Sequence, residues 1–541
     1  MLWICLPAAK LIDDNVLASY FCLTKKIRSG RYFENRIQIV RFHDSFEFNE
    51  CETLIAMEEK LVLRMTGIVS LVMVAAMLPS LAYALDQEPE MVLPFLGTML
   101  TGLAFGAYVL RTTVSQRKMR LSIRGGAVFL ALSWLYTSIL GSVPYIASGD
   151  FSVPKALFES ASALTTTGVS SVLEGAAYPS SLLLWHDVSQ WLGGIGAIII
   201  FAVIMPQLGS SAANLFSAEV QGNSAERTMP HIREAVRVLI MIYVGLTVLM
   251  ILILLVLRQP LEMAVKLAAT SISTSGYLHY RTYLTECNDP ALELFLVLFM
   301  IVGSCNFILY YRILQKRMDV FWKDTERRWY FGLLVALCLL ITVNLWQEHY
   351  YDIFQSFRYA FFQVVAIMST AGLATQDFSH WPAFSRLLLF YAAIIGGCSA
   401  STAGGVKVSR VVVLLKVCWQ EIKRTLHPRM VSVITMSGRP VPAQAIIGVG
   451  RYFFLYFIVF IALSMLYSLT GSEMLESMAT VVVFLSNVGS AYGIMGEGTT
   501  FEALSSFGYL VLYVTMIMGR IELFAFVMLL HPDFWAKKRS W

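Results

Sequence analysis

The feature that most constrains this chain is a series of apolar segments, each long enough to cross a lipid bilayer. About 20 apolar residues are needed to span roughly 30 Å of hydrocarbon. Charged residues make up only 14% of the 541 residues and hydrophobic residues 57%, whereas soluble proteins carry about 25% charged residues. We therefore predict an all-α integral membrane protein with ten transmembrane helices, at residues 62–84, 91–111, 125–146, 182–205, 237–257, 291–311, 329–346, 384–415, 445–468 and 507–530.

The basic residues predict how these spans are oriented. The loop at residues 111–124 carries five Lys or Arg residues and no acidic residue. The loops after the sixth and eighth spans and the C-terminal tail are also basic, whereas the opposite loops contain DQEPE and ECNDP. Because cytoplasmic loops are enriched in Lys and Arg, and because the number of spans is even, we expect both termini in the cytoplasm.

Residues 1–56 match neither a span nor a recognisable domain. Their charges are mixed, and the run MEEKLVLRM that begins at Met57 comes directly before the first span. Two interpretations stay open: these residues form a small cytoplasmic arm, or they are an artefact of gene prediction and Met57 is the physiological start. Mass spectrometry of the N-terminal peptide distinguishes the two.

Several function classes find no support in the sequence. The net charge of +5 is too small to indicate nucleic-acid binding, and the eight cysteines form no CxxC pair. The chain contains neither HExxH nor a Walker A sequence. We therefore predict neither an enzyme nor a bound cofactor.

Four further segments share one pattern, a helix of about three turns followed by a short Ser/Thr-rich tip that ends in glycine. The tip glycines are Gly168, Gly276, Gly372 and Gly489, which are 108, 96 and 117 residues apart. Each tip lies between two spans, so a unit of span, short helix, tip and span repeats four times. The predicted organisation is an extra pair of spans at residues 57–124, followed by four pore repeats at residues 125–236, 237–328, 329–444 and 445–541.

The repeated tips predict a pore with pseudo-fourfold symmetry. Non-helical chain at membrane depth is tolerated only where it is buried in protein or lines a water-filled path. Glycine permits backbone conformations that turn carbonyl groups toward an axis, and rings of carbonyls can replace the hydration shell of a cation. A polar surface turn is the alternative for any single tip. The predicted ion-binding residues are Thr166, Thr167, Gly168, Thr274, Ser275, Gly276, Thr370, Ala371, Gly372, Asn487, Val488 and Gly489.

The eighth span is too long for one crossing and is interrupted by two glycine pairs. Gly396, Gly397, Gly404 and Gly405 enclose small polar residues. Glycine pairs break helices, and broken helices in transporters line the transport pathway. We expect residues 396–405 to form a mobile loop that blocks the pore below the filter. Close helix packing through small residues is the alternative.

Two cationic residues are candidates for a role in gating. Arg520 falls near the middle of the last span, where a charge costs at least about 2.5–3.5 kcal/mol. We expect it to face the pore under the filter, and an ion pair with a carboxylate on another span is the alternative. Lys407 is the second candidate. Glu159 and Glu476, in the first and fourth short helices, either concentrate cations at the outer mouth or serve as caps and solvated acids.

These motifs resemble the Trk/Ktr/HKT superfamily of potassium transporters, and most closely its bacterial TrkH-type members. The resemblance covers residues 57–541 and rests on FESASALTTTGVS, QWLGGIG, STSGY, GGCSASTAGGVKVSR and MGRIEL. It implies uptake of K⁺, with Rb⁺ and Na⁺ as further candidate ions, in the bacterial cytoplasmic membrane. It also implies an intramembrane gating loop, a homodimer, and a separate cytoplasmic regulatory subunit of the TrkA type that binds NAD or ATP.

The residues leave the mode of transport open. A cation-coupled secondary transporter, driven by Na⁺ or specific for another solute, is the alternative function, because broken helices also form substrate sites. A fourfold filter is expected for a bare cation and is unnecessary for an organic molecule. Channel-like conduction and coupling to H⁺ or Na⁺ therefore need a transport measurement to separate them.

We expect Gly168→Ser to raise the ratio of sodium to potassium flux. Serine at the first tip glycine is associated with sodium permeation in the resembled superfamily, and a Cβ at this position displaces carbonyl groups from the axis. Flux measurements in vesicles check this expectation. An unchanged ratio would count against the assignment of this tip to the filter.

Overall fold

The computed structural model describes residues 59–113, 123–172, 178–200, 229–276, 281–430, 432–489, 501, 504–521 and 523–532. The chain divides into two units, Met1–Lys60 and Leu61–Trp541, and the second unit contains the packed helices and the candidate site. The predicted extension at residues 1–56 and the alternative start at Met57 lie outside the described residues. So do most of the basic loop at 111–124 and the C-terminal residues 533–541.

Most of the predicted spans appear as long apolar helices. The described residues contain six single helices that are long and apolar enough to cross a membrane, and eight such spans if each of two bent helix pairs is counted as one. The six comprise Glu59–Gln87, which ends with α3 (Leu78–Gln87), and five further helices: α4 (Pro89–Thr112), α5 (Ile123–Ala147), α9 (Met229–Val256), α15 (Thr325–Gln347) and α19 (Ala443–Ser468).

The sixth and tenth predicted spans are bent rather than straight. Helices α12 (Pro290–Ser304) and α13 (Phe307–Leu314) meet at 88°, and α21 (Ser506–Ile521) and α22 (Leu523–Leu530) meet at 115°. At the first bend, the Asn306 side chain accepts a hydrogen bond of 3.0 Å from the Ile308 amide. An Asn in this position caps a new helix, so a second helix begins where a continuous span was expected.

The remaining two predicted spans are α7 (Ser180–Ile199) and an interrupted pair, α17 (Ala383–Ile395) and α18 (Val408–Leu426). Helix α7 is long enough to cross a membrane but is less apolar than the other spans. Its first half carries polar residues, among them His186 and Asp187, which are buried inside the protein. The interruption of the eighth span at residues 396–407 agrees with the prediction from its glycine pairs.

All four predicted short helices are present, and their packing closes into a ring. They are α6 (Val153–Leu164), α10 (Leu261–Ser273), α16 (Ile353–Met368) and α20 (Met474–Leu485). Each short helix packs on helices of its own repeat and also on a helix of another repeat. Helix α10 packs on α7 of the first repeat, α16 on α12 of the second, and α20 on α17 of the third. Helix α6 packs on α21 of the fourth repeat. Each short helix thus contacts the preceding repeat, and the fourth repeat meets the first.

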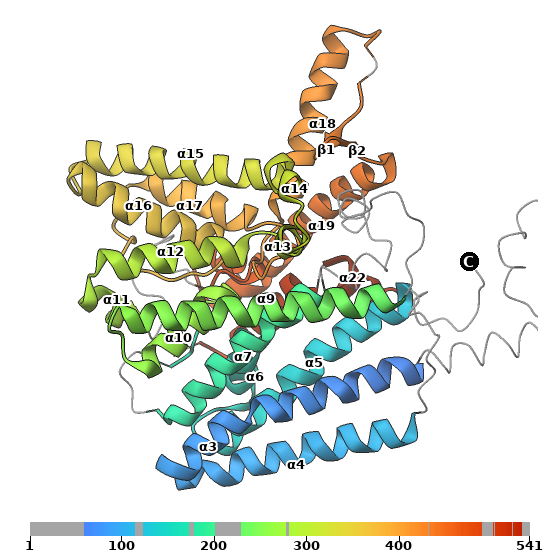
Figure 1. Ribbon diagram of the computed structural model, residues 1–541, viewed down its shortest axis with the longest axis vertical. Helices are drawn as coiled ribbons and strands as arrows, with labels where there is room; N and C mark the ends of the chain where they lie inside the picture. Colours follow the sequence, from blue (N-terminus) through green and yellow to red (C-terminus); the bar gives the residue numbers. More distant parts are fainter. Residues whose placement is uncertain are drawn as a thin grey trace, which may run out of the picture. The chain divides into compact units, whose positions relative to one another are not determined.

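The remaining elements lie around this ring. The extra N-terminal spans pack on its first repeat, α4 against α5 and α3 against α7 (Figure 1). Helix α18 extends away from the other helices, and a two-stranded antiparallel hairpin follows it (Figure 1). The strands are β1 (Thr435–Met436) and β2 (Arg439–Pro440), and the two short connecting helices are α11 (Arg281–Cys287) and α14 (Met318–Lys323).

Glycines let the inner helices, which follow the tips, approach the ends of the short helices. A Cβ on Gly303 would lie 2.7 Å from the carbonyl oxygen of Ile272, and Cβ atoms on Gly193 and Gly519 would overlap the carbonyls of Leu164 and Leu485. These three carbonyls occupy equivalent positions, four residues before a tip glycine. Small residues allow such close approach of membrane helices. The third repeat differs, because its inner helix α17 ends at Ile395.

We expect Gly303→Ala to lower the free energy of unfolding by about 1–3 kcal/mol, because the added methyl group overpacks a backbone contact. Thermal unfolding of the purified protein in detergent measures the change. Gly332→Ala in α15 is the matched control, since a Cβ there meets nothing within 4 Å, and alanine stabilises a helix relative to glycine. Equal stability of the two variants would contradict the packing argument.

Candidate functional site

The four tips meet at their backbones. We call them the filter tips: Thr165–Gly168, Ser273–Gly276, Ser369–Gly372 and Ser486–Gly489. A Cβ placed on Gly168 would overlap the carbonyl oxygen of Gly276, and one on Gly276 would overlap that of Ala371. One on Gly489 would overlap the carbonyl oxygen of Thr167. The structure therefore brings the first tip against the second and fourth, and the second against the third.

The filter tips share one backbone conformation. The residue two positions before each tip glycine has a positive φ: Thr166 (56°), Thr274 (51°), Thr370 (59°) and Asn487 (52°). Positive φ is rare for a β-branched residue such as threonine. Backbone strain of this kind persists only where the surrounding structure imposes it, and it is concentrated at functional sites. Its recurrence in four separate segments shows that the tips are equivalent in structure as well as in sequence.

Hydrogen bonds direct the tip amides back toward the short helices. The Thr167 amide donates to the Ser162 carbonyl at 2.9 Å, and the Val488 amide donates to the Val483 carbonyl at 2.9 Å. This is the pattern of a helix that ends with a left-handed residue.

The tip carbonyls differ from the tip amides in their hydrogen bonding. Within the described part of the chain, no group donates a hydrogen bond to the carbonyls of the two residues before each tip glycine. The residues that bear these carbonyls are fully buried: Thr166, Thr167, Thr274, Ser275, Thr370, Ala371, Asn487 and Val488.

Polar side chains brace the filter tips against one another and against the inner helices. The Asn487 amide donates to the Thr167 hydroxyl at 3.0 Å, which joins the fourth tip to the first. The Thr165 and Thr167 hydroxyls lie 2.8 Å apart. The Ser275 hydroxyl donates to the Gln190 side chain of α7 at 3.0 Å. These side chains fix the positions of the tips, and Gln190 is a contact that the sequence does not reveal.

The predicted gating loop lies directly against three of the filter tips. We call residues 396–405 the gating segment. Its Gly404 amide donates to the Thr370 hydroxyl at 2.8 Å, and a Cβ on Gly404 would overlap the Ser486 carbonyl. The Thr274 hydroxyl donates to the Thr402 hydroxyl at 3.0 Å. The segment thus occupies the space next to the second, third and fourth tips.

Glycine conformations shape the gating segment. Gly396 and Gly405 have φ values of 70° and 80°, and a Cβ on Gly396 would lie 2.9 Å from the Cα of Gly405. The Lys407 amide donates to the Ile395 carbonyl at 2.9 Å, so the chain returns to the point where it left α17. Side chains at these two glycines would be excluded both by φ and by the close approach of the two ends.

Glu326, which the sequence does not single out, links this loop to the start of α18. Its carboxylate accepts hydrogen bonds from the Ser399 amide at 2.7 Å and from the Ser409 amide at 3.1 Å. The Glu326 side chain is buried at the start of α15. Only the three-dimensional structure identifies it, because an acidic residue in the first turn of a helix is common.

Arg520 also contacts the gating segment. It is 2% exposed, and its guanidinium donates to the carbonyls of Thr402 at 2.8 Å and Gly193 at 3.3 Å. The ring of Trp134 lies 6.0 Å from the guanidinium, close enough for a cation–π contact. Both hydrogen bonds go to main-chain carbonyls, one in the gating segment and one in α7.

Lys407 and Arg410 add positive charge at the same place. The Lys407 ammonium donates to the Ala403 carbonyl, and the Arg410 guanidinium lies 3.8 Å from the ring centre of Tyr452. Together with Arg520 they line a cavity of about 10 Å³ beside Gly404 and Gly405, close to the minimum that holds one water. A cation that moved past the tips would meet three like charges, which repel it strongly where the dielectric constant is low.

Glu159 does not lie at an outer mouth. It is 1% exposed, and its carboxylate accepts hydrogen bonds from the Ser171 hydroxyl at 2.6 Å and the Ser170 hydroxyl at 3.1 Å. Its other oxygen is 3.9 Å from the His186 ring. Glu159 therefore holds the chain that follows the first filter tip, a role that differs from both sequence interpretations. Glu476 is partly exposed in the first turn of α20.

Comparisons with known proteins identify the family to which this chain is similar. A family described as TrkH, cation transport protein, matches residues 95–535. The Trk system potassium uptake protein TrkH of Salmonella typhimurium is 32% identical over 446 residues, which cover 82% of this chain and 92% of that protein. The protein of the same name from Vibrio parahaemolyticus is 30% identical over 486 residues, covering 88% of this chain and 100% of the relative.

A solved structure shows the same fold. The crystal structure of the potassium transporter TrkH from Vibrio parahaemolyticus matches with a TM-score of 0.80 at 29% sequence identity. The match covers 88% of this chain and 99% of that chain.

Proposed function

Because this chain belongs to the TrkH family of cation transport proteins, we propose that it carries potassium across the bacterial cytoplasmic membrane through the four filter tips. The observation that carries this proposal is the set of buried tip carbonyls that receive no hydrogen bond within the described residues. Buried carbonyls are almost always paired. A dehydrated K⁺ coordinated by rings of such oxygens supplies the missing partner.

The short helices favour a cation at the same place. Each ends at a filter tip, so the partial negative charge of its C-terminus, about half an elementary charge, lies beside the tip carbonyls. All four tip glycines are present, and in the resembled superfamily this favours potassium over sodium. The relatives from Salmonella typhimurium and Vibrio parahaemolyticus are named potassium uptake proteins.

We propose that the gating segment closes this pathway in the present conformation. It contacts three filter tips, and Arg520 and Glu326 form hydrogen bonds with its main chain. A loop bound by individual hydrogen bonds can be released at modest cost, since each contributes about 0.5–1.5 kcal/mol net and about 1.5–3 kcal/mol where a charged group takes part.

The release is proposed to come from a cytoplasmic nucleotide-binding subunit of the TrkA type. Helix α18 begins at Val408, just after the gating segment, so force applied to the helix reaches the loop directly. Its far end exposes three apolar side chains, Trp419, Ile422 and Leu426, by 61%, 53% and 70%. Exposed apolar groups of this kind mark interaction surfaces. The homodimer and the cytoplasmic position of both termini are part of the same proposal.

Rubidium uptake by liposomes that contain the purified protein tests the transport function. We expect uptake down an imposed gradient, competition by external K⁺ stronger than by Na⁺, and no requirement for a pH gradient. Empty liposomes give the background. Gly276→Ala is the matched filter variant and should lose uptake or selectivity, because its Cβ would overlap the Ala371 carbonyl. Uptake that depends on a sodium or proton gradient would contradict this proposal and support the alternative, a cation-coupled transporter.

We expect Thr402→Val to increase rubidium flux in the absence of a regulatory partner. The Thr402 hydroxyl donates to the carbonyls of Gly303 at 2.9 Å and Ile272 at 3.1 Å and accepts from Thr274. Losing these bonds weakens the closed position by about 1–3 kcal/mol. Thr402→Ser keeps the hydroxyl and is the control. Equal flux in the two variants, both folded, would show that this residue does not hold the gate.

A further inference from the structure

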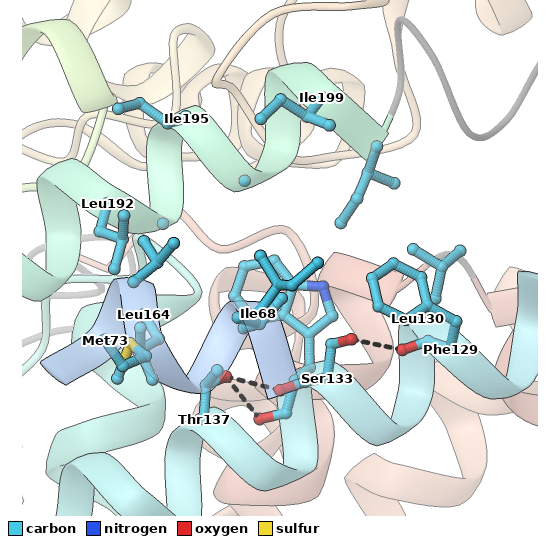
Figure 2. Close-up of a pocket in the computed structure, with 16 residues that line it drawn as sticks. Ile68, Met73, Phe129, Leu130, Ser133, Thr137, Leu164, Leu192, Ile195 and Ile199 are labelled. Carbon is cyan, nitrogen blue, oxygen red and sulfur yellow. Dashed lines mark hydrogen bonds between the residues drawn. The ribbon is translucent and has the colours of Figure 1, made fainter. Parts of the chain in front are cut away.

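An apolar pocket lies between the first span, α5 and α7, apart from the ion pathway. It encloses about 240 Å³, which exceeds the roughly 150 Å³ that is enough for a benzene molecule. Figure 2 shows the side chains around it, including Ile68 and Met73 from the first span, Phe129 from α5, Leu164 from the end of α6, and Leu192 from α7. The pocket is therefore a built cavity in the helix packing.

The pocket offers few polar groups to an occupant. Two of its lining residues, Ser133 and Thr137, carry hydroxyls, and both donate to backbone carbonyls of α5 one turn earlier, at 2.6 Å and 2.8 Å (Figure 2). Trp134 adds one indole N–H, and the other lining residues that Figure 2 labels are aliphatic or aromatic or are methionine. A polar solute would lose its hydration here with little compensation, so the pocket favours a hydrocarbon.

The pocket is continuous with the outer apolar surface of the first span. Ile68 and Val72 line it, yet they are 48% and 46% exposed. They belong to the helix Glu59–Gln87, which is long and apolar enough to cross a membrane. Exposed apolar side chains on such a helix face lipid. Hydrocarbon from the bilayer can therefore enter the pocket without passing through water.

We propose that this pocket binds an acyl chain of a membrane lipid. The chain's headgroup stays at the membrane interface, and methylene groups fill the space between α5 and α7. Burying each methylene group is favourable by about 0.8 kcal/mol relative to water, although the gain relative to surrounding lipid is smaller and comes from packing.

The inner wall of the pocket also contacts the site. Leu164, Gly193 and Trp134 line the pocket. Leu164 ends the first short helix, the Gly193 carbonyl accepts a hydrogen bond from Arg520, and the Trp134 ring lies beside the same guanidinium. The bound chain therefore supports the residues that hold Arg520 against the gating segment. This second part rests on the proposed gating function, whereas acyl-chain binding does not.

Photolabelling tests the binding. The full-length protein is placed in nanodiscs that contain phosphatidylethanolamine with a diazirine on one acyl chain, and labelled peptides are identified by mass spectrometry. We expect labels on pocket residues of α5 and α7. Gly196→Leu fills the pocket, because Gly196 lines it and has room for a Cβ 3.8 Å from the Trp134 ring. This variant should lower pocket labelling severalfold, because its side chain occupies the space in which the acyl chain packs.

Gly245→Leu is the matched control, since it adds the same side chain to α9 where a Cβ meets nothing within 4 Å. It should leave pocket labelling unchanged. Gly196→Ala, a smaller change, should give an intermediate loss and keeps the test valid if the leucine variant does not fold. Unchanged pocket labelling in both Gly196 variants, measured relative to lipid-facing peptides, would overturn the assignment.

Rubidium flux tests the link to Arg520. Flux by the wild type and by Gly245→Leu should differ between liposomes with saturated and with unsaturated acyl chains, and Gly196→Leu should lose this dependence. If Gly196→Leu loses pocket labelling while the flux of all three proteins depends on acyl-chain saturation in the same way, the link is wrong and the lipid site remains supported. Absence of rubidium flux in every protein would instead count against the proposed function, and labelling would still decide the binding.

Discussion

Four backbone segments meet at the centre of this protein, and the rest of the structure is arranged around that contact. The tip glycines are close enough to neighbouring carbonyls that no side chain would fit between them at three of the contacts. Such a junction cannot be stabilised by side-chain burial, so it needs support from outside. The short helices supply it, since each is packed between its own repeat and the preceding one. The ring of helices is thus the frame that keeps the tip carbonyls in place.

The same close approach recurs one layer below the filter tips. Gly193, Gly303 and Gly519 bring three inner helices onto the ends of short helices. In the third repeat the helix ends instead, and the gating segment occupies the corresponding space. The departure from fourfold symmetry is therefore local, and it places the loop where it can contact three tips at once. A pore with four equal inner helices would have no such element.

Charge is distributed unevenly across this loop. Arg520, Lys407 and Arg410 lie around a small cavity next to it, whereas the Glu326 carboxylate of α15 accepts hydrogen bonds from Ser399 within the loop and from Ser409 at the start of α18. Burying these groups is expensive unless each is hydrogen-bonded. Arg520 and Glu326 form their hydrogen bonds with main-chain groups of the loop, of α7 and of the start of α18. The positions of both charged groups consequently depend on the conformation of the loop, so the proposed movement of the gate would also change the electrostatic field beside the tips.

The sequence alone determined the membrane class, the short helices, the repeated tips and the interruption around residues 396–405, because apolar length, glycine pairs and a repeated Ser/Thr-Gly pattern act locally along the chain. It also singled out Arg520, since a charge within an apolar span is costly. Tertiary structure decided the bends after α12 and α21, the buried role of Glu159, and the roles of Gln190, Glu326 and Thr402. These roles carry no local signal: the partners lie between 11 and 130 positions away in sequence, and only the closed ring of helices brings them together.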